Sequence, residues 1–217
     1  MKPEVAVILP CHNSMPHLAP MLKNLYESTN FPFKLIIIES ESTDGTKEFV
    51  KLYGKFKNVE VYHTKKKGLT HAINYGIKKA KNLDVYLTQD DVIHFKLYGR
   101  DWLLEMNELA SKKEVGFVVS LGGWGVSGEE YIKGLKWAGT WNTYIPRSTI
   151  KKVGLFDENM SPGDDIDYSY RVQQAKLKGG ITNYWVQHHR LTEHGDVDSR
   201  KKQREMGEYF RRKHGIK

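Results

Sequence analysis

Two adjacent carboxylates, Asp90 and Asp91, close an apolar run that begins at Val85. A buried strand that ends in paired acids delivers them to a cleft, because neither charge is stable in the interior without a partner. Such a pair could hold a metal ion or balance another charge. A turn is an equal alternative for these two residues alone, since Asp also begins turns and caps helices.

Further carboxylates and one histidine lie after apolar stretches or at the start of a helical pattern. The segment from Glu39 to Asp44 follows one apolar run, His188 follows another, and Asp164, Asp165 and Asp167 open a helical pattern. Two carboxylates and one imidazole suit Mg²⁺ or Mn²⁺ on a diphosphate, because such ions keep positions open for phosphate oxygens. A further carboxylate away from the metal could take a proton from an attacking hydroxyl.

Asp167 also has a purely structural interpretation. It lies four residues before Arg171, so an ion pair on one helix face is a sufficient account of it.

Strands and helices alternate through the first half of the chain, which predicts an α/β domain with a mainly parallel sheet. Ligands bind beyond the carboxyl ends of the strands in such sheets, so Glu39, Asp90 and Asp91 should lie near one another. Strands are expected at 4–9, 34–38 and 59–63 and from Val85, and helices over 18–26, around 49–53 and over 69–80, with Ser14 as a cap for the first helix.

The second half has a less regular pattern. Its apolar spacing predicts helices over 102–110 and from 164, strands at 115–121, 141–146 and 181–186, and a basic helical tail from 198. The Gly- and Trp-rich segment from Gly122 to Trp141 is typical of a long loop that lines a binding site.

Composition favours one globular domain. The chain has 217 residues, of which 39% are hydrophobic and 28% charged. A single cysteine, Cys11, excludes an internal disulfide framework and a cysteine-rich zinc site. No apolar run reaches the roughly 18 residues of a spanning helix, and no signal peptide precedes the first strand, so we expect a soluble cytoplasmic protein. The net charge of +8 favours anionic partners, namely nucleotide diphosphates, anionic lipid surfaces or nucleic acid.

The order of these motifs resembles that of the family 2 glycosyltransferases, which have the GT-A fold. The segments that carry the resemblance are Val5-Ala6-Val7-Ile8-Leu9-Pro10-Cys11-His12-Asn13, Glu39-Ser40-Glu41-Ser42-Thr43-Asp44-Gly45-Thr46, Asn74-Tyr75-Gly76-Ile77, Val153-Gly154-Leu155-Phe156-Asp157-Glu158, Asp164-Asp165-Ile166-Asp167-Tyr168 and Tyr209-Phe210-Arg211-Arg212-Lys213-His214-Gly215. They span nearly the whole chain. The resemblance implies a Rossmann-like, mainly parallel sheet flanked by helices in a single domain, with a nucleotide-sugar-binding half at 1–95, an acceptor and catalytic half at 96–197 and a basic helix or tail at 198–217.

The resemblance also implies a role for individual residues. Asp165 would be the catalytic base, with Asp164 second, and a divalent ion, Mn²⁺ or Mg²⁺, would be held by Asp90, Asp91 and His188. The residues expected to contact the donor nucleotide are Pro10, His12, Asn13, Glu39, Ser40, Asn74 and Asp90. The implied reaction moves a sugar from a nucleotide diphosphate to a hydroxyl with inversion. The acceptor would be a glycan, a lipid-linked glycan or another hydroxyl.

One departure from the family pattern keeps alternatives open. The family's Asp-x-Asp falls on Thr88-Gln89-Asp90, so its first acid is missing and Asp91 would have to compensate. A nucleotide-sugar-binding protein without catalysis, or a glycosyltransferase that acts on modified DNA bases, remains an alternative. A nucleotidyltransferase would carry a Gly-rich loop after its first strand, which this chain lacks. The basic tail would suit association with a membrane surface or with nucleic acid.

Overall fold

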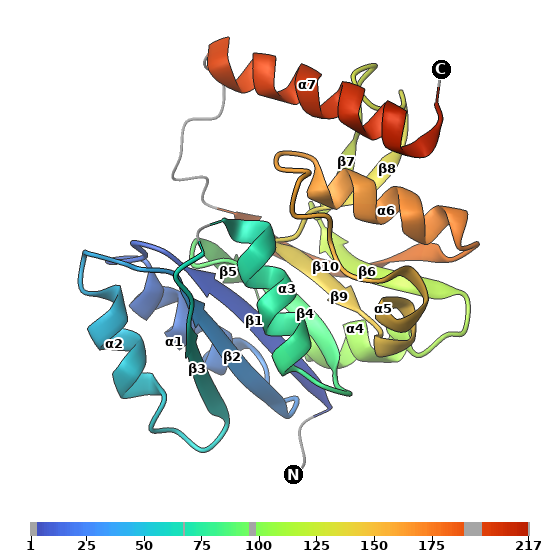
Figure 1. Cartoon of the computed structure of the whole chain (residues 1–217). Coiled ribbons are helices and arrows are strands. Elements are labelled where there is room, and N and C mark those ends of the chain that lie inside the picture. Colours follow the sequence, from blue (N-terminus) through green and yellow to red (C-terminus); the bar gives the residue numbers. More distant parts are fainter. Residues whose placement is uncertain (1–3, 67, 96–98, 189–196, 217) are drawn as a thin grey trace.

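A computed structural model describes residues 4–66, 68–95, 99–188 and 197–216, with the side chains of 197–200 left undescribed. Within these residues, one curled sheet of eight strands has the order β3-β2-β1-β4-β9-β6-β10-β5, and helices cover both of its faces (Figure 1). Its strands are β1 (Val5–Cys11), β2 (Phe33–Glu39), β3 (Val59–His63), β4 (Asp84–Thr88), β5 (Val92–His94), β6 (Val115–Leu121), β9 (Asn142–Ile145) and β10 (Lys178–His188).

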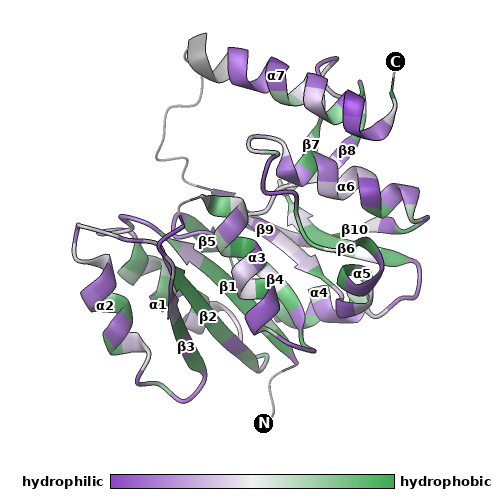
Figure 2. Ribbon diagram, viewed as in Figure 1, coloured by the Kyte–Doolittle hydropathy of each residue, from purple (hydrophilic) through white to green (hydrophobic). Residues whose placement is uncertain are grey.

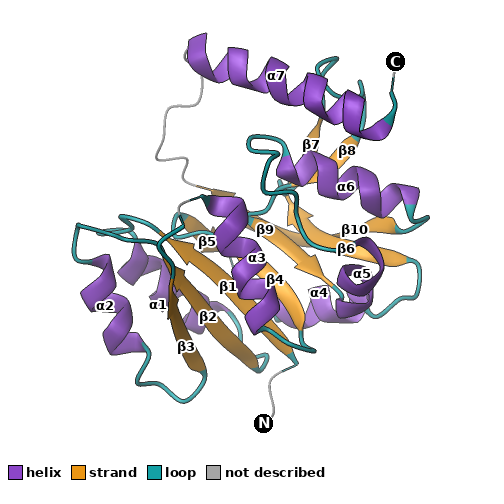
Figure 3. Ribbon diagram, viewed as in Figure 1, coloured by secondary structure: helices purple, strands orange, loops and turns teal. Residues whose placement is uncertain are grey.

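The helices connect these strands, and the last helix follows them, as Figure 3 shows. They are α1 (Leu18–Ser28), α2 (Thr46–Tyr53), α3 (Leu69–Lys79), α4 (Trp102–Ala110), α5 (Arg147–Val153), α6 (Asp164–Gln174) and α7 (Val197–His214). Among the described residues, no helix is both long enough and apolar enough to cross a membrane.

Strand direction places the ends of six strands at the same edge of the sheet. β1 pairs in parallel with β2 and β4, β2 with β3, and β6 with β10. β9 lies antiparallel between β4 and β6, so those two strands also run the same way. The carboxyl ends of β1, β2, β3, β4, β6 and β10 therefore share one edge, which confirms the mainly parallel α/β fold.

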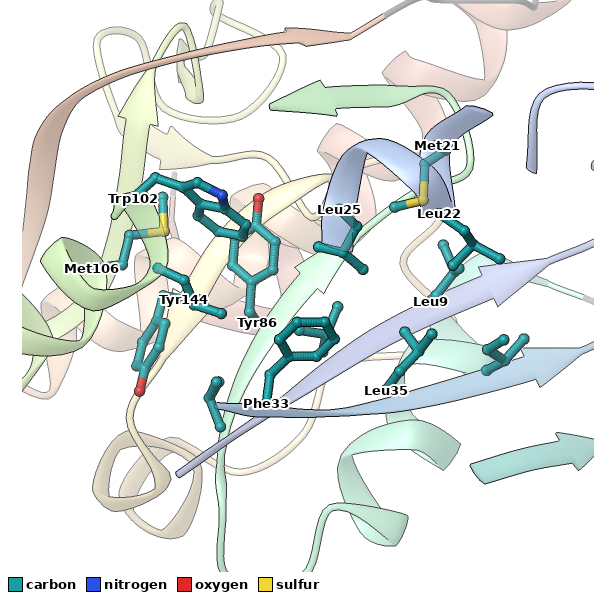
Figure 4. Close-up of a cluster of buried hydrophobic side chains, with 14 of the residues drawn as sticks. Leu9, Met21, Leu22, Leu25, Phe33, Leu35, Tyr86, Trp102, Met106 and Tyr144 are labelled. Atoms are coloured by element: carbon teal, nitrogen blue, oxygen red, sulfur yellow. The ribbon is translucent and has the colours of Figure 1, made fainter. Parts of the chain in front are cut away.

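The sheet separates two apolar layers because alternate residues of each strand point to opposite faces. Leu9 and its neighbours on one face pack against α1 and α4, as Figure 4 shows. Ile8 and its neighbours on the other face pack against α3, α5 and α6. Figure 2 shows hydrophobic colour along β1 and β2 and hydrophilic colour over most of α7, which lies on the outside of the molecule. Each fully buried Leu or Ile contributes about 1.5–3 kcal/mol by leaving water.

Gly76 allows α3 to approach β1 closely. A Cβ at this position would overlap Ile8 Cγ2 and would lie 3.4 Å from Ile38 Cγ1. The Asn74 to Ile77 motif, besides its place in the family pattern, therefore allows α3 to pack closely against the sheet.

Several sequence expectations need correction. The segment from Gly122 to Trp141 contains a second, two-stranded sheet formed by β7 (Trp124–Val126) and β8 (Lys136–Ala138), because Trp124 pairs with Ala138 across a hairpin. The short β5 and α5 were not predicted. α1 begins at Leu18 rather than next to Ser14, whose hydroxyl accepts from His12 N at 3.2 Å. The predicted basic tail is confirmed as the helix α7.

Candidate active site

A cavity of about 280 Å³ lies at the shared carboxyl edge of β1, β2 and β4. It is closed on one side by the first turns of α3. The residues that line it are Pro10, Cys11, His12, Ser40, Gly68, Leu69, Ala72, Gln89 and Asp90. Four of the residues predicted to contact the donor, Pro10, His12, Ser40 and Asp90, are thus brought together. Gln89, Cys11 and the α3 residues were missed, although a Gly directly before a helix is a signal for anion binding.

The loops after β1 and β2 hold each other in place at the mouth of this cavity. His12 Nδ1 lies 2.5 Å from Ser40 O. Asn13 Oδ1 accepts from Thr43 N at 2.8 Å, and Asn13 N donates to Ser42 Oγ at 3.1 Å. Asn13 therefore connects the two loops rather than lining the cavity.

Glu39 is buried behind the same loops, with 1% of its surface exposed. Its Oε1 accepts from Ser42 N at 2.6 Å, and its Oε2 lies 2.8 Å from His63 Nδ1. Burial alone would raise the pKa of Glu39, but the hydrogen bonds from Ser42 and His63 outweigh it and lower the pKa below its usual value. The carboxylate thus has its partners within the protein.

Asn74 joins α3 to the segment that leads into α6. Its amide accepts from Phe156 N at 3.0 Å and donates to Phe156 O at 2.9 Å and to Glu158 Oε1 at 3.2 Å. Glu158 also pairs with Lys66 and lies 3.1 Å from His71 Nδ1. The Lys66 ammonium, against the opposing effect of burial, holds the pKa of Glu158 at about 2. Asn74, predicted to contact the donor, is 3% exposed and lies outside the cavity lining.

Asp90 and Asp91 follow β4, as expected. Burial, with the neighbouring negative charge of Asp91, raises the pKa of Asp90 above its usual value. Asp91 Oδ1 lies 3.2 Å from His188 Nε2 at the end of β10, within ion-pair distance but without a hydrogen bond. The His188 ring stacks on Trp141, with ring centroids 4.6 Å apart.

The fit of this corner to a divalent ion can be judged from its buried atoms that make no hydrogen bond. Asp91 Oδ1 and His188 Nδ1 are both buried, and neither has a hydrogen-bond partner in the described structure. An oxygen and an imidazole nitrogen are donors that Mn²⁺ and Mg²⁺ accept. Three or more His, Cys, Asp or Glu side chains arranged to hold a metal are not found together among the described residues. The pair can therefore supply part of a coordination sphere, with room for oxygens from a ligand.

Asp164 and Asp165 form the first turn of α6, after Gly163 in the left-handed region with φ of 104°. Asp164 is 8% exposed and accepts from Thr70 Oγ1 at 2.9 Å. The half-buried Asp165 accepts from Ile166 N at 2.8 Å. Burial, with the charge of Asp164 second, raises the pKa of Asp165 to about 7, and burial raises the pKa of Asp164. A carboxylate with a near-neutral pKa is suited to general base catalysis.

Asp167 lies one turn further along α6 and has no exposed surface. It accepts from Arg171 Nε at 2.8 Å, which confirms the predicted pair. It also accepts from Lys213 Nζ at 2.7 Å and lies 2.8 Å from His214 Nε2. These two contacts, which the sequence did not predict, attach α7 to α6.

The comparisons with known proteins agree with this architecture. The sequence model of glycosyl transferase family 2 matches residues 6–163, which is most of the chain. The chain belongs to glycosyl transferase family 2. An uncharacterised glycosyltransferase of Rickettsia bellii is 25% identical over 190 residues, covering 82% of this chain and 28% of that protein. The O-antigen chain rhamnosyltransferase RfbN of Salmonella typhimurium is 30% identical over 94 residues, covering 42% of this chain and 29% of that protein.

Solved structures of glycosyltransferases share the fold of this family 2 domain. The mannosyltransferase PcManGT of Pyrobaculum calidifontis, in complex with GDP-Man and Mn²⁺, has a TM-score of 0.67 at 20% identity, covering 84% of this chain and 55% of that one. GalNAc-T7 with UDP, GalNAc and Mn²⁺ has a TM-score of 0.71 at 16% identity, covering 97% and 50%. These similarities show the GT-A fold. In four curated relatives, the match covers between 15% and 31% of the relative's length.

Proposed function

We propose that this domain transfers a sugar from a nucleotide diphosphate donor to an acceptor hydroxyl. The observation that carries the proposal is the 2.9 Å hydrogen bond from Thr70 to Asp164. It joins the acidic first turn of α6 to the first turn of α3, where Gly68 and Leu69 line the cavity. Carboxylates suited to proton transfer therefore lie beside a cavity at the strand edge where α/β folds bind nucleotides.

The donor would occupy that cavity. Solved structures with this fold hold GDP-Man, UDP or UDP-GlcNAc. Gly68 and Leu69 at the start of α3 line the cavity. The backbone N–H groups at the start of a helix favour an anion, which supports a diphosphate position there. His12, Ser40 and Asp90, which line the cavity, would contact the nucleotide. Asn13, Glu39 and Asn74 would not contact the donor directly. They would hold in place the loops and the helix α3 that line the cavity.

Asp91 and His188 would hold a divalent ion beside Asp90, and structures with this fold contain Mn²⁺. Such an ion supplies positive charge to the departing diphosphate. Asp165 would accept the proton of the acceptor hydroxyl as that oxygen attacks the anomeric carbon, with Asp164 beside it. A direct displacement of this kind inverts the anomeric centre. The similarity to an O-antigen rhamnosyltransferase favours a glycan or lipid-linked glycan acceptor. The basic residues of α7 would suit an anionic membrane surface in the cytoplasm.

The test compares Asp165→Asn with Glu27→Gln, a change of an exposed acid on α1. Donor turnover is measured as released nucleoside diphosphate with a panel of glycan acceptors. Loss of the base should lower kcat by about 10²–10⁴-fold while donor binding persists. An Asp165→Asn variant that transfers sugar at the wild-type rate would show that the base is another group.

The donor can be identified independently of turnover. UDP, GDP, CDP and dTDP are compared in a thermal-shift assay with and without Mn²⁺, because a ligand that binds the folded state raises its stability. We expect one nucleotide to raise Tm in a Mn²⁺-dependent way. No shift with any of the four would contradict a nucleotide site in the cavity.

A second candidate function is nucleotide-sugar binding without catalysis. It is favoured by Thr88, which stands where the family has an acid and whose buried hydroxyl has no hydrogen-bond partner in the described structure. Donor binding without transfer or hydrolysis, with every acceptor tried and with Mn²⁺ present, would support this candidate.

A further inference from the structure

The aromatic ring of Tyr131 lies directly on Gly163, the residue before Asp164 and Asp165. A Cβ at Gly163 would lie 2.5 Å from the Tyr131 hydroxyl oxygen and 2.9 Å from two of its ring carbons. Tyr131 is 7% exposed, and its hydroxyl donates to Pro162 O at 3.3 Å. The ring therefore covers the backbone from which the two candidate catalytic carboxylates project.

The last helix holds this ring from behind. Phe210 of α7 is fully buried and makes an edge contact with Tyr131, with ring centroids 5.6 Å apart. On the same face of α7, Gly207 packs directly on the Glu130 backbone, which leaves no space for a side chain there. Arg211 donates to Glu129 O at 3.2 Å and to Glu130 O. The loop between β7 and β8 is thus fastened to α7.

The same helix is fastened to α6. Lys213 and His214 contact the buried Asp167, and the Phe210 ring also meets Tyr170 of α6 at 5.3 Å between centroids. In Figure 1, α7 lies across α6 and the β7–β8 hairpin. A continuous set of contacts therefore runs from α7 through Phe210 and Tyr131 to the first turn of α6.

We propose that Tyr131, backed by Phe210 of α7, is a positioning residue that holds the first turn of α6 and keeps water from Asp165. The proposal rests on the proposed function of Asp165 as the base. It extends that function by making activity depend on the β7–β8 loop and on the C-terminal helix, which come from outside the donor-binding half.

The charges around Asp165 allow the effect to be predicted. The Asp165 carboxylate interacts electrostatically with Asp164 on the same turn and with Tyr131 on the loop, and Tyr131 in turn faces the charge of Glu130. The negative charge of Asp167 is balanced by Arg171, Lys213 and His214. Opening the covering ring would hydrate the Asp164 and Asp165 carboxylates, and hydration favours their charged forms. The pKa of Asp165 would then fall, and its position relative to the acceptor would loosen.

The test uses Tyr131→Ala, Tyr131→Phe and Phe210→Ala, with Tyr53→Ala on α2 as the matched control. Tyr131→Ala should lower kcat by about 10–100-fold, since small displacements of a catalytic group have effects of this size. It should also move the acid limb of the kcat profile to lower pH and leave the donor KM within about twofold. Tyr131→Phe keeps the ring and should restore both kcat and the acid limb, and Phe210→Ala should shift both in the direction of Tyr131→Ala.

Each alternative outcome is distinguishable. Thermal unfolding identifies a variant that fails to fold: Phe210→Ala decides the question where Tyr131→Ala does not fold, and Tyr131→Ala decides it where Phe210→Ala does not. An unmoved acid limb in folded Tyr131→Ala or Phe210→Ala, while Asp165→Asn is inactive, would overturn the positioning role and leave the proposed function intact. An active Asp165→Asn would instead overturn the proposed function. A loss of kcat in Tyr53→Ala equal to that in Tyr131→Ala would show a general effect of losing an aromatic ring and would also overturn the proposal.

Discussion

Asp167 should be the single acid whose removal destabilises the protein most. It is completely buried and faces three cationic or potentially cationic groups, Arg171, Lys213 and His214, at 2.7–2.8 Å. Asp167→Ala would leave these groups without their carboxylate. Breaking a buried ion pair in this way costs about 3–5 kcal/mol in free energy of unfolding. Asp167→Asn keeps the shape and one acceptor oxygen, so we expect a smaller loss of about 1.5–3 kcal/mol.

The contacts of Asp167 also determine how the loss of stability in Asp167→Ala depends on pH. Burial alone would raise the pKa of Asp167, but its hydrogen bonds to Lys213, Arg171 and His214 lower it below the usual value. A carboxylate with a lowered folded-state pKa stabilises the protein above its unfolded-state pKa, about 3.9, and this contribution is lost as pH falls through the folded-state pKa. The difference between wild type and Asp167→Ala should be complete near neutral pH and should close in strong acid.

Urea unfolding of both variants at several pH values measures these differences. Glu129→Gln is the matched control, because Glu129 and Lys133 form an ion pair with both side chains 79% exposed. Exposed pairs contribute little, so this control should stay within about 0.5 kcal/mol of wild type. A loss below about 1 kcal/mol for Asp167→Ala at neutral pH would refute the inferred attachment of α7 through this carboxylate.

Three further predictions concern the site and its support. The transfer rate should fall as pH drops below about 7, because burial raises the pKa of Asp165 to about 7 and the protonated carboxyl cannot accept a proton. Measuring kcat from about pH 5 to about pH 9 checks this prediction, and a flat profile would contradict it. Asp91→Asn should weaken Mn²⁺-dependent donor binding by about 10–100-fold in calorimetric titrations, and unchanged affinity would place the ion elsewhere. Gly76→Ala should cost about 1–3 kcal/mol in urea unfolding, because the added methyl overlaps Ile8, and a neutral result would mean that α3 shifts freely.

Much of the fold follows from local patterns in the sequence. The apolar runs of β1, β2 and β4 and the helical spacing in α1 and α3 predict a parallel α/β sheet, because fully buried strands and amphipathic helices differ in period. This arrangement alone predicts that the segments after β1, β2 and β4 meet at one edge, with Glu39, Asp90 and Asp91 near one another. The hairpin between Gly122 and Trp141 was missed because its strands are only three residues long and rich in Gly and Trp.

Sequence alone therefore determined the fold class, the family resemblance and the acids that open α6, since these depend on residue types at short spacing. Tertiary structure decided which of those residues have partners. Asn13, Glu39 and Asn74 form hydrogen bonds inside the protein, whereas Asp91 and His188 each retain a buried atom without a hydrogen bond. The contacts of α7 also depend on packing between segments far apart in the chain. Long-range contacts set burial and charge balance, so only the folded chain shows that Asp165 is tuned toward neutrality while Asp167, two residues away, remains ionised.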